Sequence, residues 1–402
     1  MESTGPLTMP SEQRRGADGS QRSPSTPSSS VLAAARRALT LPLLSALVAT
    51  GCGLAVAGVL DLGDLSQSGA YLMVAAALLA IGLYGSTSGI DVRQTRGHVK
   101  TVLMAVTVGV LLKAALISAV MYLAFGRPEY IVLGVAVAQI DPLSVAALRG
   151  DGRLSPRARS ILSAWSSFDD PITVLLTVYF SALALRAAGR AAPTGADGAM
   201  DYVFDLVANA AFAAAVLLLW WLGRELRRRR EDASAASGTG GAPPARRVLG
   251  TTYLGGLLAL AAAQFLMLGI ALVGLFFRPL SERFVDGLVR YALLVSSFCL
   301  GLLLIQGVSP VEGMVLGALA FLSQAVVSIP ITRGLPRDDR ISLALGQQNG
   351  ITAIILALVL QPSFPETVAI VAPAILTANL LHFAANAAWN RARRRVPDGL
   401  SR

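Results

Sequence analysis

The chain contains a series of long apolar runs, each with the length of a membrane-spanning helix. About 20 apolar residues cross a hydrocarbon core of ~30 Å. With 54% hydrophobic and 14% charged residues, the chain is too apolar for a soluble domain of its size. Because a backbone in lipid must satisfy its own hydrogen bonds, the runs predict an all-α polytopic membrane protein. They lie near 39–60, 70–89, 99–124, 130–148, 160–185, 202–223, 248–277, 287–305, 309–332, 341–360 and 367–390.

The segments outside these runs suggest how the chain is organised. Residues 1–35 are rich in Ser, Pro, Gly and Arg, which predicts a disordered cytoplasmic tail. A transmembrane domain is expected over 36–391, with a basic cytoplasmic linker at 224–247 between its two halves. A basic cytoplasmic tail at 392–402 completes the chain.

The distribution of arginines indicates the number of helices, because basic residues near helix ends accumulate on the cytoplasmic side. With the N-terminus inside and eleven helices, every arginine after residue 277 would lie outside. If 248–277 forms two short helices, these arginines move inside and join the earlier basic clusters. We therefore expect about twelve helices, both termini in the cytoplasm, and Arg230, Arg283 and Arg337 on the inner side.

Four ionisable residues lie deep in the apolar runs: Lys113, Asp141, Asp169 and Asp170. Each is roughly 15–18 Å along its expected helix, close to the middle of the membrane. A charge at that depth costs at least ~2.5 kcal/mol, so such residues are candidates for a functional site. A structural salt bridge is the alternative, but one lysine cannot neutralise three carboxylates. The group predicts an ion transporter and leaves open whether Lys113 pairs with Asp169 or Asp141.

Two of the runs share a weak pattern of Gln, then Asp or Asn, then a helix breaker. Pro142 removes a backbone donor, whereas Gly350 permits an irregular turn. Irregular backbone at membrane depth is tolerated where it lines a cavity or is buried in protein. Paired interruptions in two halves of opposite direction point to the binding site of an inverted-repeat transporter. Interhelical hydrogen bonding is the other interpretation of these glutamines. The two segments read Gln139-Ile140-Asp141-Pro142 and Gln347-Gln348-Asn349-Gly350.

The order of these motifs resembles the monovalent cation:proton antiporters, the sodium/hydrogen exchanger family. The likeness rests on Asp141-Pro142 in a broken fourth helix, Asp169-Asp170 in the fifth, and a later broken helix. It extends over roughly residues 39 to 391. It implies inverted repeats with two crossed, discontinuous helices, the fourth and eleventh of twelve. It also implies a mobile core, a dimerising scaffold and a homodimer.

The resemblance also implies roles for the deep residues. Asp170 would bind the cation and the proton, with Asp169 as its partner, and Asp141 would offset the dipoles of the crossed helices. In the family, double-aspartate members tend to exchange electrogenically. The run at 309–332 lacks the lysine that pairs with the first aspartate in such members, and we infer that Lys113 compensates the charge instead.

Further departures from the family pattern lie in the two broken helices. Ile140 stands where the family often has Thr, and Gln347-Gln348-Asn349 replaces the arginine of many Asn-Asp relatives.

The predicted function is secondary active antiport of a monovalent cation (Na⁺, or K⁺ or Li⁺) for protons by alternating access. Burial and a neighbouring carboxylate favour the protonated form of Asp170, so proton and cation compete for one group. Oxygen ligands suit an alkali cation. They would come from carboxylates, from carbonyls near Ile140 and Asn349, and from the hydroxyl of Ser167 or Thr173. No cofactor or enzymatic activity is expected, and the protein is assigned to a bacterial plasma membrane.

Other functional classes fit less well. A sodium-coupled organic-anion symporter could share the fold, and Gln348-Asn349 resembles its crossing helix, but adjacent aspartates are unexpected there. An intramembrane aspartyl protease would use two carboxylates, yet the chain has no Gly-x-Gly-Asp motif. A channel would need a continuous pore. The net charge of +10 lies in loops beside the membrane, which favours anionic lipid over nucleic acid as its partner.

Overall fold

The computed structural model describes residues 29–60, 64–90, 99–141, 154–187, 189, 199–235, 245–346 and 350–395. Every regular element in these ranges is a helix, which confirms the predicted all-α class. The α-helices are α1 (Ser29–Val59), α2 (Gly69–Ser88), α4 (Val99–Met104), α5 (Val110–Phe125), α6 (Glu129–Ala136), α8 (Pro156–Ala187), α9 (Ala199–Ala235), α10 (Ala245–Ala263), α11 (Met267–Phe276), α12 (Glu282–Leu303), α13 (Pro310–Ile331), α14 (Arg337–Ala344), α15 (Ile351–Leu360) and α16 (Thr367–Arg395).

Seven helices in the described ranges are long and apolar enough to cross a membrane, and several shorter apolar helices accompany them. The multi-pass prediction is therefore confirmed, while the total of twelve crossings stays a prediction. The 248–277 run is divided into α10 and α11, as the distribution of arginines predicted. The helices separate at residues 264–266, where Phe265 has a positive φ of 54°.

The predicted tails and linker lie largely outside the described residues, which omit 1–28, 236–244 and 396–402. Within them, α9 continues as one helix through Ala235, so the first part of the expected linker at 224–247 is helical.

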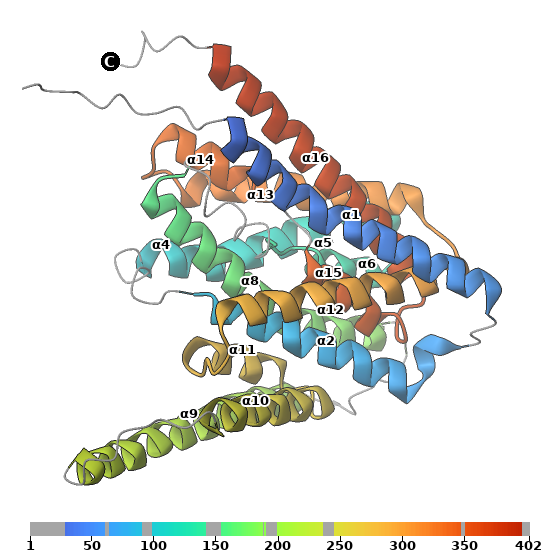
Figure 1. Cartoon of the computed structure of the whole chain (residues 1–402). Coiled ribbons are helices and arrows are strands. Elements are labelled where there is room, and N and C mark those ends of the chain that lie inside the picture. Colours follow the sequence, from blue (N-terminus) through green and yellow to red (C-terminus); the bar gives the residue numbers. More distant parts are fainter. Residues whose placement is uncertain are drawn as a thin grey trace, which may run out of the picture.

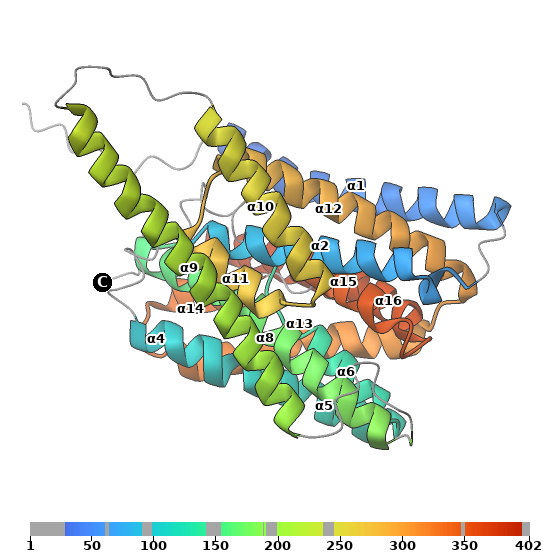
Figure 2. The ribbon, with the colours of Figure 1, turned by 90° about the horizontal axis from the view of Figure 1, so that it is seen from below.

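The helices form one bundle in which α8 occupies a central position. α8 packs against α2, α5, α6 and α11, and α1 lies along α12 (Figure 1). α9 and α10 run along one side of the bundle in both views (Figure 2). α9 exposes apolar side chains such as Phe204, Val207 and Leu218, as a lipid-facing helix does. The core is therefore built around the helix that carries both adjacent aspartates.

Two helical segments are interrupted in the middle of the bundle. α6 ends at Ala136 and the chain is non-helical through Asp141, while α14 ends at Ala344 and α15 begins at Ile351. The interruptions touch, because a Cβ added to Gly350 would overlap the Asp141 carboxylate. Only glycine leaves room for that carboxylate. Pro142, Gln347, Gln348 and Asn349 fall outside the described residues. The crossing of the two helices remains a prediction.

Candidate functional site

Lys113 and Asp169 form a completely buried ion pair between α5 and α8. The Lys113 Nζ lies 2.6 Å from Asp169 Oδ2, and both side chains have no exposed surface. The backbone N–H of Ile140 donates to the same carboxylate oxygen at 2.9 Å. The structure thus selects Asp169 over Asp141 as the partner of Lys113. Removing one member of such a pair strongly destabilises the folded protein, because the other charge is then buried alone.

Asp170 has no comparable partner. It is 1% exposed, and neither of its carboxylate oxygens receives a hydrogen bond. The hydroxyl of Thr352, in the first turn of α15, lies close to it, and the negative charge of Asp141 is also nearby. The hydroxyls of Thr352 and Thr173 are likewise buried without hydrogen bonds. Because buried polar groups normally have partners, these unpaired oxygens point to a ligand.

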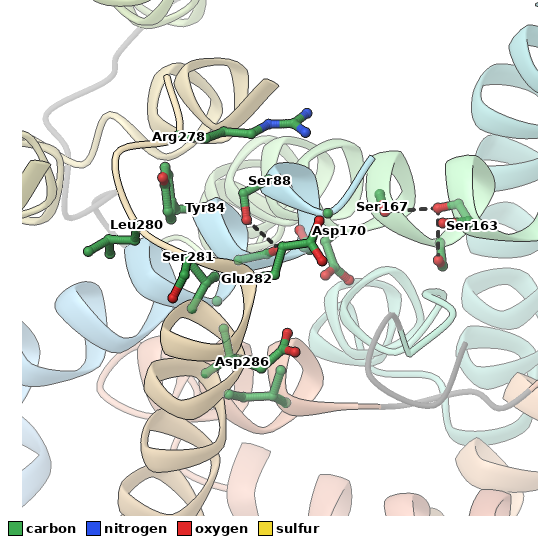
Figure 3. A pocket seen from close by; sticks show the side chains of 18 residues that line it. Tyr84, Ser88, Ser163, Ser167, Asp170, Arg278, Leu280, Ser281, Glu282 and Asp286 are labelled. Carbon is green, nitrogen blue, oxygen red and sulfur yellow. Dashed lines mark hydrogen bonds between the residues drawn. The ribbon is translucent and has the colours of Figure 1, made fainter. Parts of the chain in front are cut away.

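A cavity of about 470 Å³ leads to Asp170. It begins where α2 ends, at Ser88 and Gly89, and where α12 begins, at Ser281 and Glu282. In Figure 3, Ser163 and Ser167 lie on one side of the cavity, Tyr84 and Ser281 on the other, and Asp170 between them. Serine hydroxyls and the carboxylates of Glu282 and Asp286 line the path, which suits a hydrated cation.

The opposite ends of the same helices are joined by hydrogen bonds, which we call the polar seal. Tyr71 Oη, in the first turn of α2, donates to the carbonyl of Leu358 at 2.8 Å. Gln67 Nε2 donates to the carbonyl of Pro362 at 3.1 Å. Gln361 Nε2 donates at 3.3 Å to Oε1 of Gln306, in η5 (Leu304–Gln306) after α12. The cavity thus reaches Asp170 from one end of the bundle, and these hydrogen bonds hold the helices together at the other.

The model of the family described as sodium/hydrogen exchanger, transmembrane, matches residues 28–384. The chain belongs to the sodium/hydrogen exchanger family. Its members are transporters, which removes the protease alternative. A comparison with curated proteins finds no match.

Solved structures agree on the fold of this exchanger. The sodium proton antiporter MjNhaP1 from Methanocaldococcus jannaschii, determined at pH 8, superposes with a TM-score of 0.62 at 16% identity. The match covers 90% of this chain and 99% of the other. An electron-microscopy structure of the same antiporter gives a TM-score of 0.55 at 16% identity, over 93% of this chain and 99% of that one. At such identity the likeness shows the shared fold.

The exchanger brings together the four deep ionisable residues that the sequence singled out. Gln139 is buried beside them and donates to the carbonyl of Ala136 at 3.1 Å, which leaves its Oε1 without a partner. Ser167 lines the cavity but donates to Ser163 O at 2.8 Å, so its proton is used within α8. In the described ranges, no group of three or more His, Cys, Asp or Glu side chains is arranged to hold a metal ion.

Sequence reasoning missed three members of this region. Thr352 went unnoticed because a lone threonine in an apolar run carries no charge signal. Glu282 and Asp286 both precede the 287–305 run, at a helix end where acidic residues are ordinary. Their spacing of four places both on one face of a helix, which was the available signal.

Proposed function

We propose that this exchanger is a secondary active antiporter that exchanges Na⁺ for protons by alternating access, with Asp170 as the group that binds either ion. The observation that carries the proposal is Asp170 itself, a buried carboxylate that lines a cavity and whose two oxygens receive no hydrogen bond. Family membership supports cation/proton exchange. Na⁺ is preferred over K⁺ and Li⁺ because it is the cation in the family's description.

Competition between the two ions follows from the charges around the site. Lys113 neutralises Asp169, so Asp170 is left with a charge that one cation or one proton offsets. An unloaded carboxylate is costly to carry through a low-dielectric barrier. The loaded forms cross more readily, which couples the movement of the two ions. Alkali cations prefer oxygen ligands, and the free oxygens of Asp170, Thr352 and Thr173 supply them.

The neighbouring residues shape this site. Asp169 holds Lys113 and accepts the Ile140 N–H. Asp141 lies against Gly350, next to the positive N-terminal end of α15, where a carboxylate is favourable. In this proposal the interrupted helices cross here. Gln139 then contributes to the polar lining.

The proposed orientation places the cavity on the cytoplasmic side of a bacterial plasma membrane. Twelve helices with both termini inside put Arg278, which lines the cavity, and Arg283 among the cytoplasmic arginines. The structure then represents an inward-open state. We further propose a homodimer surrounded by anionic lipid, with 36–391 as the transporting unit and basic tails on either side.

The decisive experiment reconstitutes the purified exchanger in proteoliposomes that contain a pH-sensitive dye. Na⁺ pulses should produce proton counterflow, and parallel K⁺ and Li⁺ pulses should produce less. Asp170→Asn should abolish exchange while the protein remains inserted, and Asp169→Asn should retain partial exchange with altered pH dependence. Asp205→Asn, which changes an exposed carboxylate on α9, is the matched control and should behave as wild type.

Two results would overturn the proposal. Asp170→Asn with near wild-type exchange would remove Asp170 from the ion-binding role. Na⁺-driven uptake of an organic anion without proton counterflow would support the symporter alternative.

A further inference from the structure

Trp165 lies directly beneath the ammonium group of Lys113. The Nζ of Lys113 stands 5.6 Å from the centre of the Trp165 ring, within the range of a cation–π interaction. Trp165 has no exposed surface, and its indole N–H has no hydrogen-bond partner. The ring is thus buried in the interior against the Lys113 ammonium.

α8 and the helix that carries Lys113 contact each other at two points, one turn apart. Gly109 and Lys113 are four residues apart on one helix, and Trp165 and Asp169 are four apart on the other, so each pair shares a helix face. Gly109 faces Trp165, because a Cβ at residue 109 would come within 3.1 Å of the ring atom Cζ2. Lys113 faces Asp169. The close packing of Gly109 against Trp165 sets the distance between the two helices, and therefore the distance across the Lys113–Asp169 pair one turn away.

A π-helical turn sets the rotation of this helix. Residues Ala105–Gly109 form η3, a π-helix between α4 and α5. A π turn carries an extra residue per turn, so it rotates everything after it relative to a regular α-helix. Lys113 is the first charged residue beyond this turn, and it points at Asp169. The turn and the ring together bring a lysine of the third expected helix to the aspartate pair.

We propose that Trp165 is a positioning residue for ion exchange, which holds the Lys113 ammonium against Asp169. This inference rests on the proposed function, because it concerns the charge that offsets Asp169 beside the ion-binding carboxylate. Trp165 acts through Lys113 and touches no transported ion.

The charged groups that bear on Lys113 come from a few elements. α13 and η3 also pack against α5, and they carry no ionisable residue at this depth. The relevant charged residues on all packed elements are Asp169 and Asp170 in mid-α8, Asp141 after α6, Glu129 at the start of α6, Arg157, Arg159 and Arg186 near the ends of α8, and Glu312 in the first turn of α13.

The test compares Trp165→Leu, Trp165→Phe and Lys113→Ala in proteoliposomes over a range of pH. Losing the ring should shift the exchange profile toward higher pH by about 0.5–1 unit for Trp165→Leu and by less for Trp165→Phe. The direction matches Lys113→Ala, because in both variants the ammonium no longer fully offsets the charge of Asp169. In Lys113→Ala, adding Trp165→Leu should cause no further shift. Trp220→Leu is the matched control, since Trp220 lies 5.6 Å from the guanidinium of Arg224 on α9.

A second measurement separates this inference from the proposed function. Thermal unfolding in detergent of wild type, both single variants and the double variant forms a double-mutant cycle that needs no transport. We expect the two changes to be non-additive. An unchanged pH profile in Trp165→Leu, or additive effects with Lys113→Ala in both assays, would overturn the positioning role. Absence of exchange in the wild type would instead refute the proposed function and leave the coupling measurable.

Discussion

Removing the Lys113 ammonium should destabilise the exchanger in a way that depends on pH. The ion pair is fully buried, with Nζ and Oδ2 separated by 2.6 Å. In Lys113→Ala, the Asp169 carboxylate keeps only the donor from Ile140. Losing one partner of a buried pair costs about 3–5 kcal/mol. The carboxyl group avoids part of this cost by taking up a proton.

The free energy needed to keep Asp169 protonated determines how strongly, and in which direction, the stability of the variant depends on pH. An aspartate in water ionises near pH 4, so holding Asp169 protonated at pH 7 costs about 4 kcal/mol, and about 1.4 kcal/mol less for each unit toward acid. The folded variant binds one proton more than the unfolded chain does. Its stability relative to wild type therefore falls as pH rises from 5 to 8. The space left by the missing side chain adds a cost that does not vary with pH.

Thermal unfolding in detergent between pH 5 and pH 8 measures this effect. Lys113→Met fills most of the space and should show the same pH dependence as Lys113→Ala. The double variant Lys113→Ala with Asp169→Asn should lose the pH dependence, because no titratable group remains at residue 169, and should exchange better than Lys113→Ala alone. A deficit that is constant with pH, or a double variant as defective as the single one, would refute the reasoning.

The other predictions concern topology and the geometry around the site. Cysteines placed at Arg337 and at the C-terminus should react with impermeant reagents only from the cytoplasmic side, and labelling from outside would contradict the twelve-helix arrangement. Gly350→Ala should reduce exchange at least tenfold, because the added methyl overlaps the Asp141 carboxylate; Gly255→Ala, where a Cβ meets open space, is the control. Thr352→Val removes one proposed cation ligand and should raise the half-saturating Na⁺ concentration about fivefold, roughly one hydrogen bond, while thermal stability stays within about 0.5 kcal/mol of wild type. An unchanged Na⁺ dependence would remove Thr352 from the site.

The residues that carry a large energetic penalty in lipid were predictable from the sequence. Lys113, Asp141 and the aspartate pair stand out because a charge at the membrane centre is rare. The interruption at Gly350 was predictable because glycine breaks helical regularity. The division of the 248–277 run followed from the positions of arginines far along the chain. In each case the informative residue differs in chemical type from the residues around it.

The contacts between residues of different helices could not be predicted from the sequence. The partner of Lys113 depends on the rotation of its helix, and the π turn at Ala105–Gly109 that sets this rotation has an ordinary apolar sequence. Trp165 in an apolar run is indistinguishable from any core aromatic until its neighbour is known. Thr352 gains its role only from its proximity to Asp170. These are properties of packing between segments far apart in the chain.

The polar seal has a consequence for how the exchanger responds to the two solutions it separates. Its three hydrogen bonds, at about 1 kcal/mol each, favour the state open at the Asp170 cavity by a factor on the order of a hundred. An ion arriving at the sealed face finds a receptive site only in that minor fraction of molecules, so its apparent affinity is weaker by the same factor. In the proposed orientation the polar seal faces the external solution, so external Na⁺ would rarely occupy the site even at high concentration. External Na⁺ would then inhibit the exchanger only weakly, and the protein could continue to export Na⁺ into a medium of high Na⁺ concentration.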